Sequence, residues 1–410
     1  MGVAIAPADP APAPERTGPG RAHWLHVARE AADDLATDAV AREQAGKHPF
    51  DEVSRLREAG LLTLLAPVQS GGGGADWATA CAVLREIAAA DGAIGQLLGC
   101  HYYLSWGTRF FSSPDLAARV ALRSTAEQWC WGGGLARQEA SPVLGGRSGR
   151  RVLDGRQSYA TGVLVADRLA VRAVRAGTGE PLAVLVDPAG PGVRVDADTG
   201  GFGQRLVAGG SVEFDAVPVA DDDVLGSLSA DEEALSPSAA LASPVGRLVS
   251  VQLLLGMAEG VLAEVREYSR TSHTPWPLTS AAPQAPTDPH VLTAYGELTV
   301  LTRSASALAD QALDAAREGL SAGDDLGFDQ YAEISVLIAM AEAAASRAAH
   351  ESTTRALDVL GPRAASARLG LDRFWRNART HTLHEPAARR FREVGDYWLN
   401  GTHPAFVLPV

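Results

Sequence analysis

Two histidines near the end of the chain have the type and spacing of a proton-transferring pair. His381 and His384 lie three residues apart in the run WRNARTHTLHEP, Trp375 to Pro386, so on a helix they would share one face. Pro386 disfavours helical geometry at the preceding residue, which predicts a helix end there. The negative end of the helix dipole would then favour protonated imidazoles. Such a pair suits general acid–base chemistry near neutral pH.

Other chemistries fit these residues less well. Paired histidines on one helical face can be half of a zinc or iron site, but no HExxH run or carboxylate spacing accompanies them, so no metal ligand is predicted. A hydrolase triad is disfavoured because the chain has no GxSxG elbow. The glycine run SGGGG, Ser70 to Gly74, has no preceding strand and no following Lys-Ser/Thr, which predicts a loop and not a phosphate cradle.

The bulk composition predicts a folded, soluble enzyme. The chain has 410 residues, enough for two or three packed units, with 46% hydrophobic and 21% charged residues. A net charge of −13 without a basic tract argues against nucleic acid and anionic membranes as partners. Cys81, Cys100 and Cys130 match no redox or zinc spacing, which favours buried thiols in a reducing, cytoplasmic compartment. No apolar run approaches the roughly 20 residues of a membrane helix.

The elements that must position these residues change in type along the chain. Residues 1–22 are rich in Pro and Ala and predict a disordered tail without the positive region of a signal peptide. Residues 23–131 predict a helical domain, and residues 132–230, with alternating strands and glycine turns, predict a small antiparallel β domain. Residues 231–410 predict a long-helix bundle, because Asp329 to Leu360 contains no Gly or Pro and would form a helix of roughly 48 Å. The fold class is therefore α+β, mainly α.

Four segments carry a resemblance to the acyl-CoA dehydrogenase superfamily. Phe50 to Gly95 resembles its N-terminal helical domain, and Gly203 to Gly226 resembles the segment that closes its β domain. WRNARTHTLHEP and Val394 to Thr402, VGDYWLNGT, are similar to its flavin-dependent monooxygenase branch, which includes dibenzothiophene and sulfur-acquisition oxygenases. The resemblance implies that reduced FMN arrives from a separate flavin reductase and forms a flavin hydroperoxide. One oxygen atom then passes to S, N or C of a small, largely apolar substrate. A homotetramer or homodimer is also implied.

The resemblance also implies roles for single residues. His384 would face the flavin, His381 would support it or touch the substrate, and His101 would line the same pocket. Thr161 would meet the flavin ring through its hydroxyl or amide. Gly361 and Arg363 match a pair that approaches the flavin phosphate, often across a subunit boundary.

The sequence departs from the branch at several positions. An arginine that usually holds the flavin phosphate is replaced by Thr274, and His273 or Arg270 are the candidate substitutes. An aromatic residue is missing at Thr199 and a tyrosine at Ser105, so dibenzothiophene is not carried over as the substrate.

Two alternatives remain open at this point. Glu385 aligns roughly with the base of FAD-dependent acyl-CoA or carrier-bound acyl dehydrogenases, although Pro386 and the adjacent His384 favour oxygenation. Thr274 leaves room for a flavin-free binding protein of the same fold.

Overall fold

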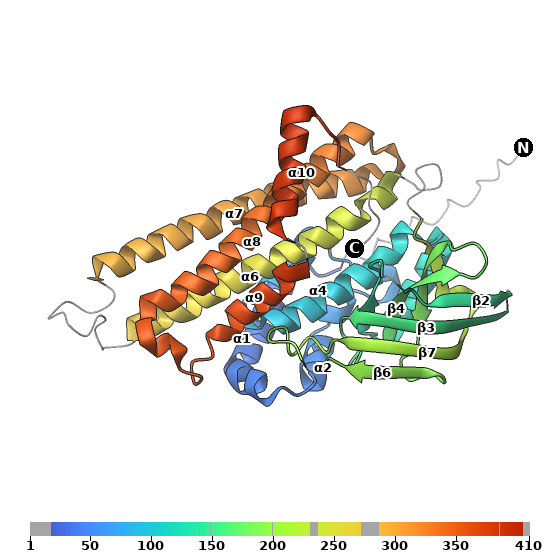
Figure 1. Ribbon diagram of the computed structural model, residues 1–410, viewed down its shortest axis with the longest axis horizontal. Helices are drawn as coiled ribbons and strands as arrows, with labels where there is room; N and C mark the ends of the chain where they lie inside the picture. Colours follow the sequence, from blue (N-terminus) through green and yellow to red (C-terminus); the bar gives the residue numbers. More distant parts are fainter. Residues whose placement is uncertain are drawn as a thin grey trace, which may run out of the picture.

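The chain folds as helices, then a sheet, then a bundle of long helices. The computed structural model describes residues 18–138, 140–147, 149–198, 200–229, 237–271, 287–384 and 386–404. The strands gather at one end of the molecule, and the long C-terminal helices extend away from them (Figure 1). This order confirms the mainly helical α+β class. Residues 1–17 of the predicted tail lie outside the described residues, and the first helix begins at Arg21.

The N-terminal part contains five α-helices. They are α1 (Arg21–Ala45), α2 (Phe50–Glu58), α3 (Trp77–Ala90), α4 (Gly92–Gly107) and α5 (Pro114–Ala126). Asp76 caps α3 by accepting from the Thr79 amide, and Asp91 caps α4 by accepting from the amides of Ala93 and Ile94. The glycine run before α3 forms turns and irregular structure, as predicted for a loop.

Eight strands form one sheet in the middle of the chain. They are β1 (Trp131–Gly134), β2 (Val143–Arg147), β3 (Arg150–Ala160), β4 (Arg168–Arg175), β5 (Pro181–Val186), β6 (Val193–Ala197), β7 (Gly210–Val219) and β8 (Val224–Ser227). The order is β6-β7-β3-β2-β4-β5-β8, with β1 also on β4. Most neighbours are antiparallel, but β1 and β2 both run parallel to β4. The predicted antiparallel sheet is therefore corrected to a mixed sheet, because alternation reports which face is buried and not strand direction.

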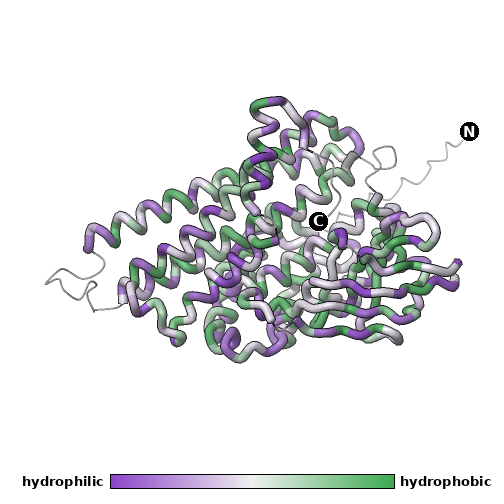
Figure 2. Tube along the Cα trace, viewed as in Figure 1, coloured by the Kyte–Doolittle hydropathy of each residue, from purple (hydrophilic) through white to green (hydrophobic). Residues whose placement is uncertain are grey.

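The C-terminal part is built on three long helices and two shorter ones. They are α6 (Ala242–Thr271), α7 (Pro289–Ala322), α8 (Phe328–Leu360), α9 (Asp372–His384) and α10 (Ala387–Asn400). The 33 residues of α8 confirm the predicted long helix. Hydrophobic and hydrophilic residues alternate along these helices, as on helices with one buried stripe (Figure 2).

Helix α6 runs through the core between α3, α4 and α8. Glycines allow this approach, since a Cβ on Gly260 would lie 2.1 Å from the Ala89 carbonyl oxygen of α3. The segment Ala239–Thr271 is long and apolar enough to cross a membrane, with a hydropathy of 1.6, but 67% of its most apolar window is buried inside the protein. That burial is typical of a core helix.

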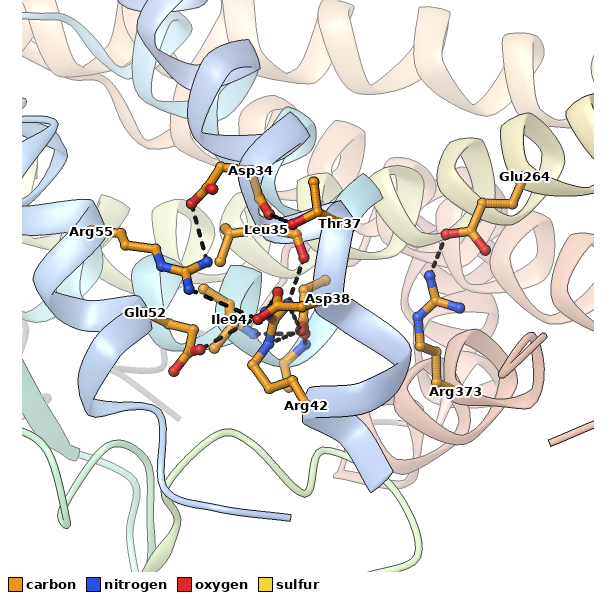
Figure 3. A network of polar contacts seen from close by, with 12 residues as sticks. Asp34, Leu35, Thr37, Asp38, Arg42, Glu52, Arg55, Ile94, Glu264 and Arg373 are labelled. Atoms are coloured by element: carbon orange, nitrogen blue, oxygen red, sulfur yellow. Dashed lines mark hydrogen bonds and ion pairs between the residues drawn. The ribbon is translucent and has the colours of Figure 1, made fainter. Parts of the chain in front are cut away.

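A buried arginine ties the N-terminal helices together. Arg42 of α1 donates to Asp91 Oδ2 at 3.0 Å. Arg42 also donates to the Leu35 carbonyl at 2.8 Å and pairs with Asp38 (Figure 3). Because Asp91 caps α4 as well, one carboxylate fixes α1 against the start of α4. This start determines where the rest of α4 lies.

Candidate active site

A cavity of about 400 Å³ lies where α4, α6, α8, α9 and α10 meet the end of β3. Both histidines of the WRNARTHTLHEP run line it. Its polar and titratable lining comprises Gln96, Cys100, Tyr103, Tyr159, Thr161, Ser243, Arg247, Ser250, Glu342, Ser346, His381, Thr382, His384 and Arg390. Apolar walls with a few convergent polar groups are typical of a small-molecule site.

One stripe of α4 forms a wall of the cavity. Gln96, Gly99, Cys100 and Tyr103 follow helical spacing and all line it. Burial raises the pKa of the Cys100 thiol to about 12, so this cysteine stays protonated and unreactive. Burial also raises the pKa of Tyr103, which keeps its hydroxyl a donor. Sequence reasoning missed Gln96 and Tyr103, although the stripe was the signal that could have found them.

His381 is held in one tautomer by α4. Its Nδ1 lies 3.2 Å from Gln96 Oε1, and because an amide oxygen only accepts, Nδ1 carries the proton. Burial, with a smaller contribution from His384, lowers the pKa of His381 to about 4. The prediction that the helix dipole favours a protonated His381 is wrong, because desolvation outweighs the dipole. A neutral His381 therefore offers its unprotonated Nε2 as an acceptor.

His384 closes the last turn of α9 and lines the cavity while remaining exposed to solvent. The predicted pairing of the two histidines on one helix near its C-terminus is confirmed. One ring is thus desolvated and the other is open to water. This difference in environment separates their chemistry.

The opposite half of α9 anchors these histidines. Arg373 in the first turn forms an ion pair with Glu264 of α6 (Figure 3). Arg376 Nη1 lies 2.6 Å from Glu43 Oε1 of α1. Asn377 Oδ1 accepts from the Gln204 amide at 2.7 Å. Contacts to three separate parts of the chain therefore fix α9.

His101 does not line the cavity, contrary to its predicted place. It is 0% exposed, its Nδ1 accepts from the Trp131 amide at 3.0 Å, and its Nε2 donates to the Leu62 carbonyl at 2.7 Å. It lies five residues after Gln96, about 140° around α4 from the cavity stripe. Burial lowers the pKa of His101 to about 4, so the ring is neutral. His101 joins α4 to β1 and has no nitrogen free for substrate.

Thr161 does line the cavity, just after β3. Its amide donates to the Gly133 carbonyl at 3.1 Å, which leaves its hydroxyl as the group that can meet a ligand. Tyr159, which sequence reasoning missed, also lines the cavity. Its φ is 53° and its side chain is 86% exposed. A tyrosine in the left-handed region is strained, and such strain gathers at functional sites.

The predicted phosphate-binding residues lie far from this cavity. Gly361 follows the cavity residue Ser346 by fifteen positions on α8, roughly 22 Å along the helix. Arg363 follows in the next turn, and Arg270 lies sixteen residues beyond Leu254 on α6, roughly 24 Å away. Four positions named in the sequence analysis lie outside the described residues: Thr199, His273, Thr274 and Glu385.

A ring of four charged residues forms one end of the cavity. Arg247 Nε lies 2.8 Å from Glu342 Oε2, and Arg390 Nε lies 2.7 Å from the same oxygen. Glu393 completes the ring at 3.3 Å from Arg247 and 2.9 Å from Arg390. The ring joins α6, α8 and α10. In the described part of the chain, this ring included, no group of three or more His, Cys, Asp or Glu side chains could hold a metal ion.

Comparisons with known proteins cover almost the whole chain. Residues 23–120 match the acyl-CoA dehydrogenase N-terminal domain and residues 248–388 match the acyl-CoA dehydrogenase C-terminal domain. A dibenzothiophene monooxygenase of Mycolicibacterium goodii is 35% identical, covering 93% of this chain and 94% of that protein. The "Probable FMNH2-dependent monooxygenase SfnC" of Pseudomonas putida is 34% identical, covering 96% and 98%.

Solved structures agree with the sequence relatives. The FMN-bound structure of TdsC from Paenibacillus sp. A11-2, a dibenzothiophene monooxygenase, has a TM-score of 0.89 at 34% identity, covering 94% of this chain and 100% of that one. A further structure of the same protein contains FMN and indole. The fold of this chain is therefore shared with a relative whose structure contains FMN.

Proposed function

The chain belongs to the acyl-CoA dehydrogenase family, and from this premise we propose that its cavity serves a two-component flavin-dependent monooxygenase. The protein is an oxidoreductase that uses reduced FMN and O2 to oxygenate a small, largely apolar substrate. A separate flavin reductase supplies the reduced FMN, as the FMNH2 dependence of its relative implies. The observation that carries the proposal is the pair His381 and His384 on one wall of the cavity.

The residues at the sheet side of the cavity fit a flavin ring. Thr161 presents a free hydroxyl, and Tyr159 holds an exposed aromatic ring at the cavity edge at the cost of backbone strain. An aromatic face and a nearby donor suit a flat, polar-edged ring. Reduced flavin, when bound, supplies the electrons that activate O2.

The two histidines have different roles in handling protons. His384 is open to solvent and can exchange protons with it. His381 stays neutral, with its proton fixed at Nδ1 by Gln96, so it accepts a hydrogen bond at Nε2. This arrangement lets one ring deliver or remove a proton while the other orients a polar group.

The predicted phosphate-binding residues lie too far from this cavity to serve it in their own chain. Arg270, Gly361 and Arg363 lie at the same end of the parallel helices α6 and α8, more than four turns from the cavity. We propose that they serve the cavity of a neighbouring copy in a homotetramer or homodimer. Apolar surface on α10 supports an interface, since Trp398 is 88% and Leu399 82% exposed. Light scattering coupled to size exclusion measures the number of copies.

A cytoplasmic location is part of the same proposal. It is supported by three free cysteines, two of them fully buried, and by the acidic net charge of −13. A reductase in the same compartment can then supply the reduced flavin.

Replacing His384 tests the function. The His384→Ala variant is expected to keep its fold and flavin binding but to lose product formation, while hydrogen peroxide released per flavin oxidised rises. The assay mixes protein, photoreduced FMN, O2 and indole, and it measures oxygenated product and peroxide together. His290→Ala, at an exposed position on α7, is the matched control. An unchanged ratio of product to peroxide in His384→Ala would show that His384 takes no part in the mechanism. If wild type and both variants form no product, the proposal that the protein oxygenates indole is refuted.

A further inference from the structure

We propose that the apolar substrate enters the cavity through a second hollow, the α8–α10 groove, which lies between α8 and the place where α9 ends and α10 begins. Flavin then enters separately, at the sheet side of the cavity beside Tyr159 and Thr161. This inference rests on the proposed function, because it gives the substrate of the oxygenation its own route to the histidines.

The α8–α10 groove has a volume of about 420 Å³ and a mainly apolar lining. Its apolar residues are Leu383, Pro386, Ala387 and Phe391. Two of them lie at the protein surface, since Leu383 is 52% and Phe391 58% exposed. Exposed apolar side chains around a hollow favour contact with an apolar molecule that leaves water. A neutral, apolar substrate therefore fits this groove.

The wall between the groove and the cavity is thin. Ser346, Thr382 and Ala387 line both hollows. They belong to three different helices, α8, α9 and α10, which meet at this wall. Because these side chains are small, a modest movement of one helix against another can join the two hollows.

One hydrogen bond crosses this wall from α8 to α9. His350 Nε2 lies 2.6 Å from Thr382 Oγ1. Burial, with a smaller contribution from Arg379, lowers the pKa of His350, so the ring is neutral at pH 7. A single hydrogen bond between neutral groups is a weak closure, because water can replace either partner. Breaking it opens the wall without separating two charges.

The chain beside the groove is fixed at two points and exposed between them. His381 bonds to Gln96 of α4, and Arg390 pairs with α8. Between these anchors, Leu383, Pro386 and Ala388 are exposed. Exposed segments with few buried contacts open more readily than a packed core. The groove can therefore widen while α4 still holds His381 in place.

Cys100 reports on entry because it lines the cavity from α4. Cys81 and Cys130 are buried outside the cavity lining and serve as internal controls. Burial raises the pKa of all three thiols to about 12, so a difference in their reaction rates reports access and not thiol chemistry.

The assay exposes the full chain to N-phenylmaleimide, a neutral apolar reagent, and follows each cysteine by mass spectrometry. Cys100 is expected to react about 10-fold faster than Cys81 and Cys130, which react only when the core opens. The measurement needs neither flavin nor O2. A failure of oxygenation would therefore leave these rates intact, which separates this inference from the proposed function.

Two variants and one control locate the entrance. Leu383→Trp narrows the groove and should slow the labelling of Cys100 about 5-fold. His350→Ala removes the bond across the wall and should speed it about 5-fold. Leu292→Trp, at a 55% exposed position on α7, is the matched control and should label like wild type. Unchanged labelling of Cys81 and Cys130 shows that each variant keeps its core.

Three results would overturn the inference. The first is equal labelling of the three cysteines in wild type. The second is wild-type labelling of Cys100 in either groove variant, which is also the result expected if another copy of the chain covers the groove. The third is a slowing in Leu292→Trp as large as that in Leu383→Trp.

Discussion

Replacing His101 with glutamine separates a structural from a catalytic role for this histidine. In the folded protein burial lowers the pKa of His101 from 6.5 to about 4, and both ring nitrogens bond to main-chain groups. As the pH falls from about 6.5 towards 4, His101 therefore binds a proton in the unfolded chain but stays neutral in the folded chain. His101 contributes full stability above this range and progressively less within it.

The size of the effect follows from the shift. A difference of about 2.5 pKa units corresponds to roughly 3 kcal/mol, of which about 2 kcal/mol is lost between pH 7 and pH 5. Glutamine does not titrate, and its side-chain amide can still donate to the Leu62 carbonyl. The loss of unfolding free energy between pH 7 and pH 5 should therefore be about 2 kcal/mol smaller in His101→Gln than in wild type. His381 titrates in both proteins and cancels from the difference.

The assay is urea unfolding followed by tryptophan fluorescence at pH 7 and pH 5, with Tyr102→Phe as the control for disturbing the same helix. At pH 7 the variant should be about 1–3 kcal/mol less stable, because the Trp131 amide loses its ring acceptor. Coupled oxygenation at pH 7 should remain close to wild type, since His101 does not line the cavity. A wild-type pH dependence of stability, or uncoupling like that of His384→Ala, refutes the reasoning.

Two further replacements test the walls of the cavity. Glu342→Gln leaves two buried arginines without their shared carboxylate, so the free energy of unfolding should fall by about 3 kcal/mol. Hydrogen–deuterium exchange should show amide exchange in α10 about 100-fold faster than in wild type. Glu351→Gln, the control, changes a more exposed ion pair on the same helix and should alter the free energy of unfolding by less than about 0.5 kcal/mol. Equal effects of the two replacements would exclude the ring of charged residues as the anchor of α10. Gln96→Glu puts a carboxylate beside Nδ1 of His381, raises the pKa of that histidine and should move the acid limb of the pH–rate profile to higher pH; an unmoved limb would mean that His381 does not titrate in the reaction.

The order of helices and strands was predictable from local pattern. The absence of Gly and Pro from Asp329 to Leu360 predicted one long helix, and α8 covers nearly the same residues. The direction of β1 and β2 was not predictable, because their pairing with β4 depends on segments far apart in the chain. Alternation gives the buried face of a strand and leaves its neighbours open.

The site was predictable where its residues are neighbours in sequence. His381 and His384 reach one cavity because three residues place them on one helical face. His101 was misplaced because a resemblance assigns a residue type to a pocket without fixing its angle on α4. The protonation of His381 was also wrong, since the cost of burial depends on α4 and on its bond with Gln96. Arg247 and its partners gave no local signal at all.

The WRNARTHTLHEP run makes better physical sense as an anchored helix than as a list of catalytic residues. Of its polar side chains, Arg376 and Asn377 bond to α1 and to the loop before β7, and the Thr382 hydroxyl donates to the Ala378 carbonyl. His381 and His384 line the cavity. A short helix that carries acid–base groups in its last turn must be fixed elsewhere, because a shift of about 1 Å in those groups can cost a hundredfold in rate. The thirteen-residue helix α9 therefore carries both the anchoring side chains and the histidines, because the anchors fix the position of the histidine rings.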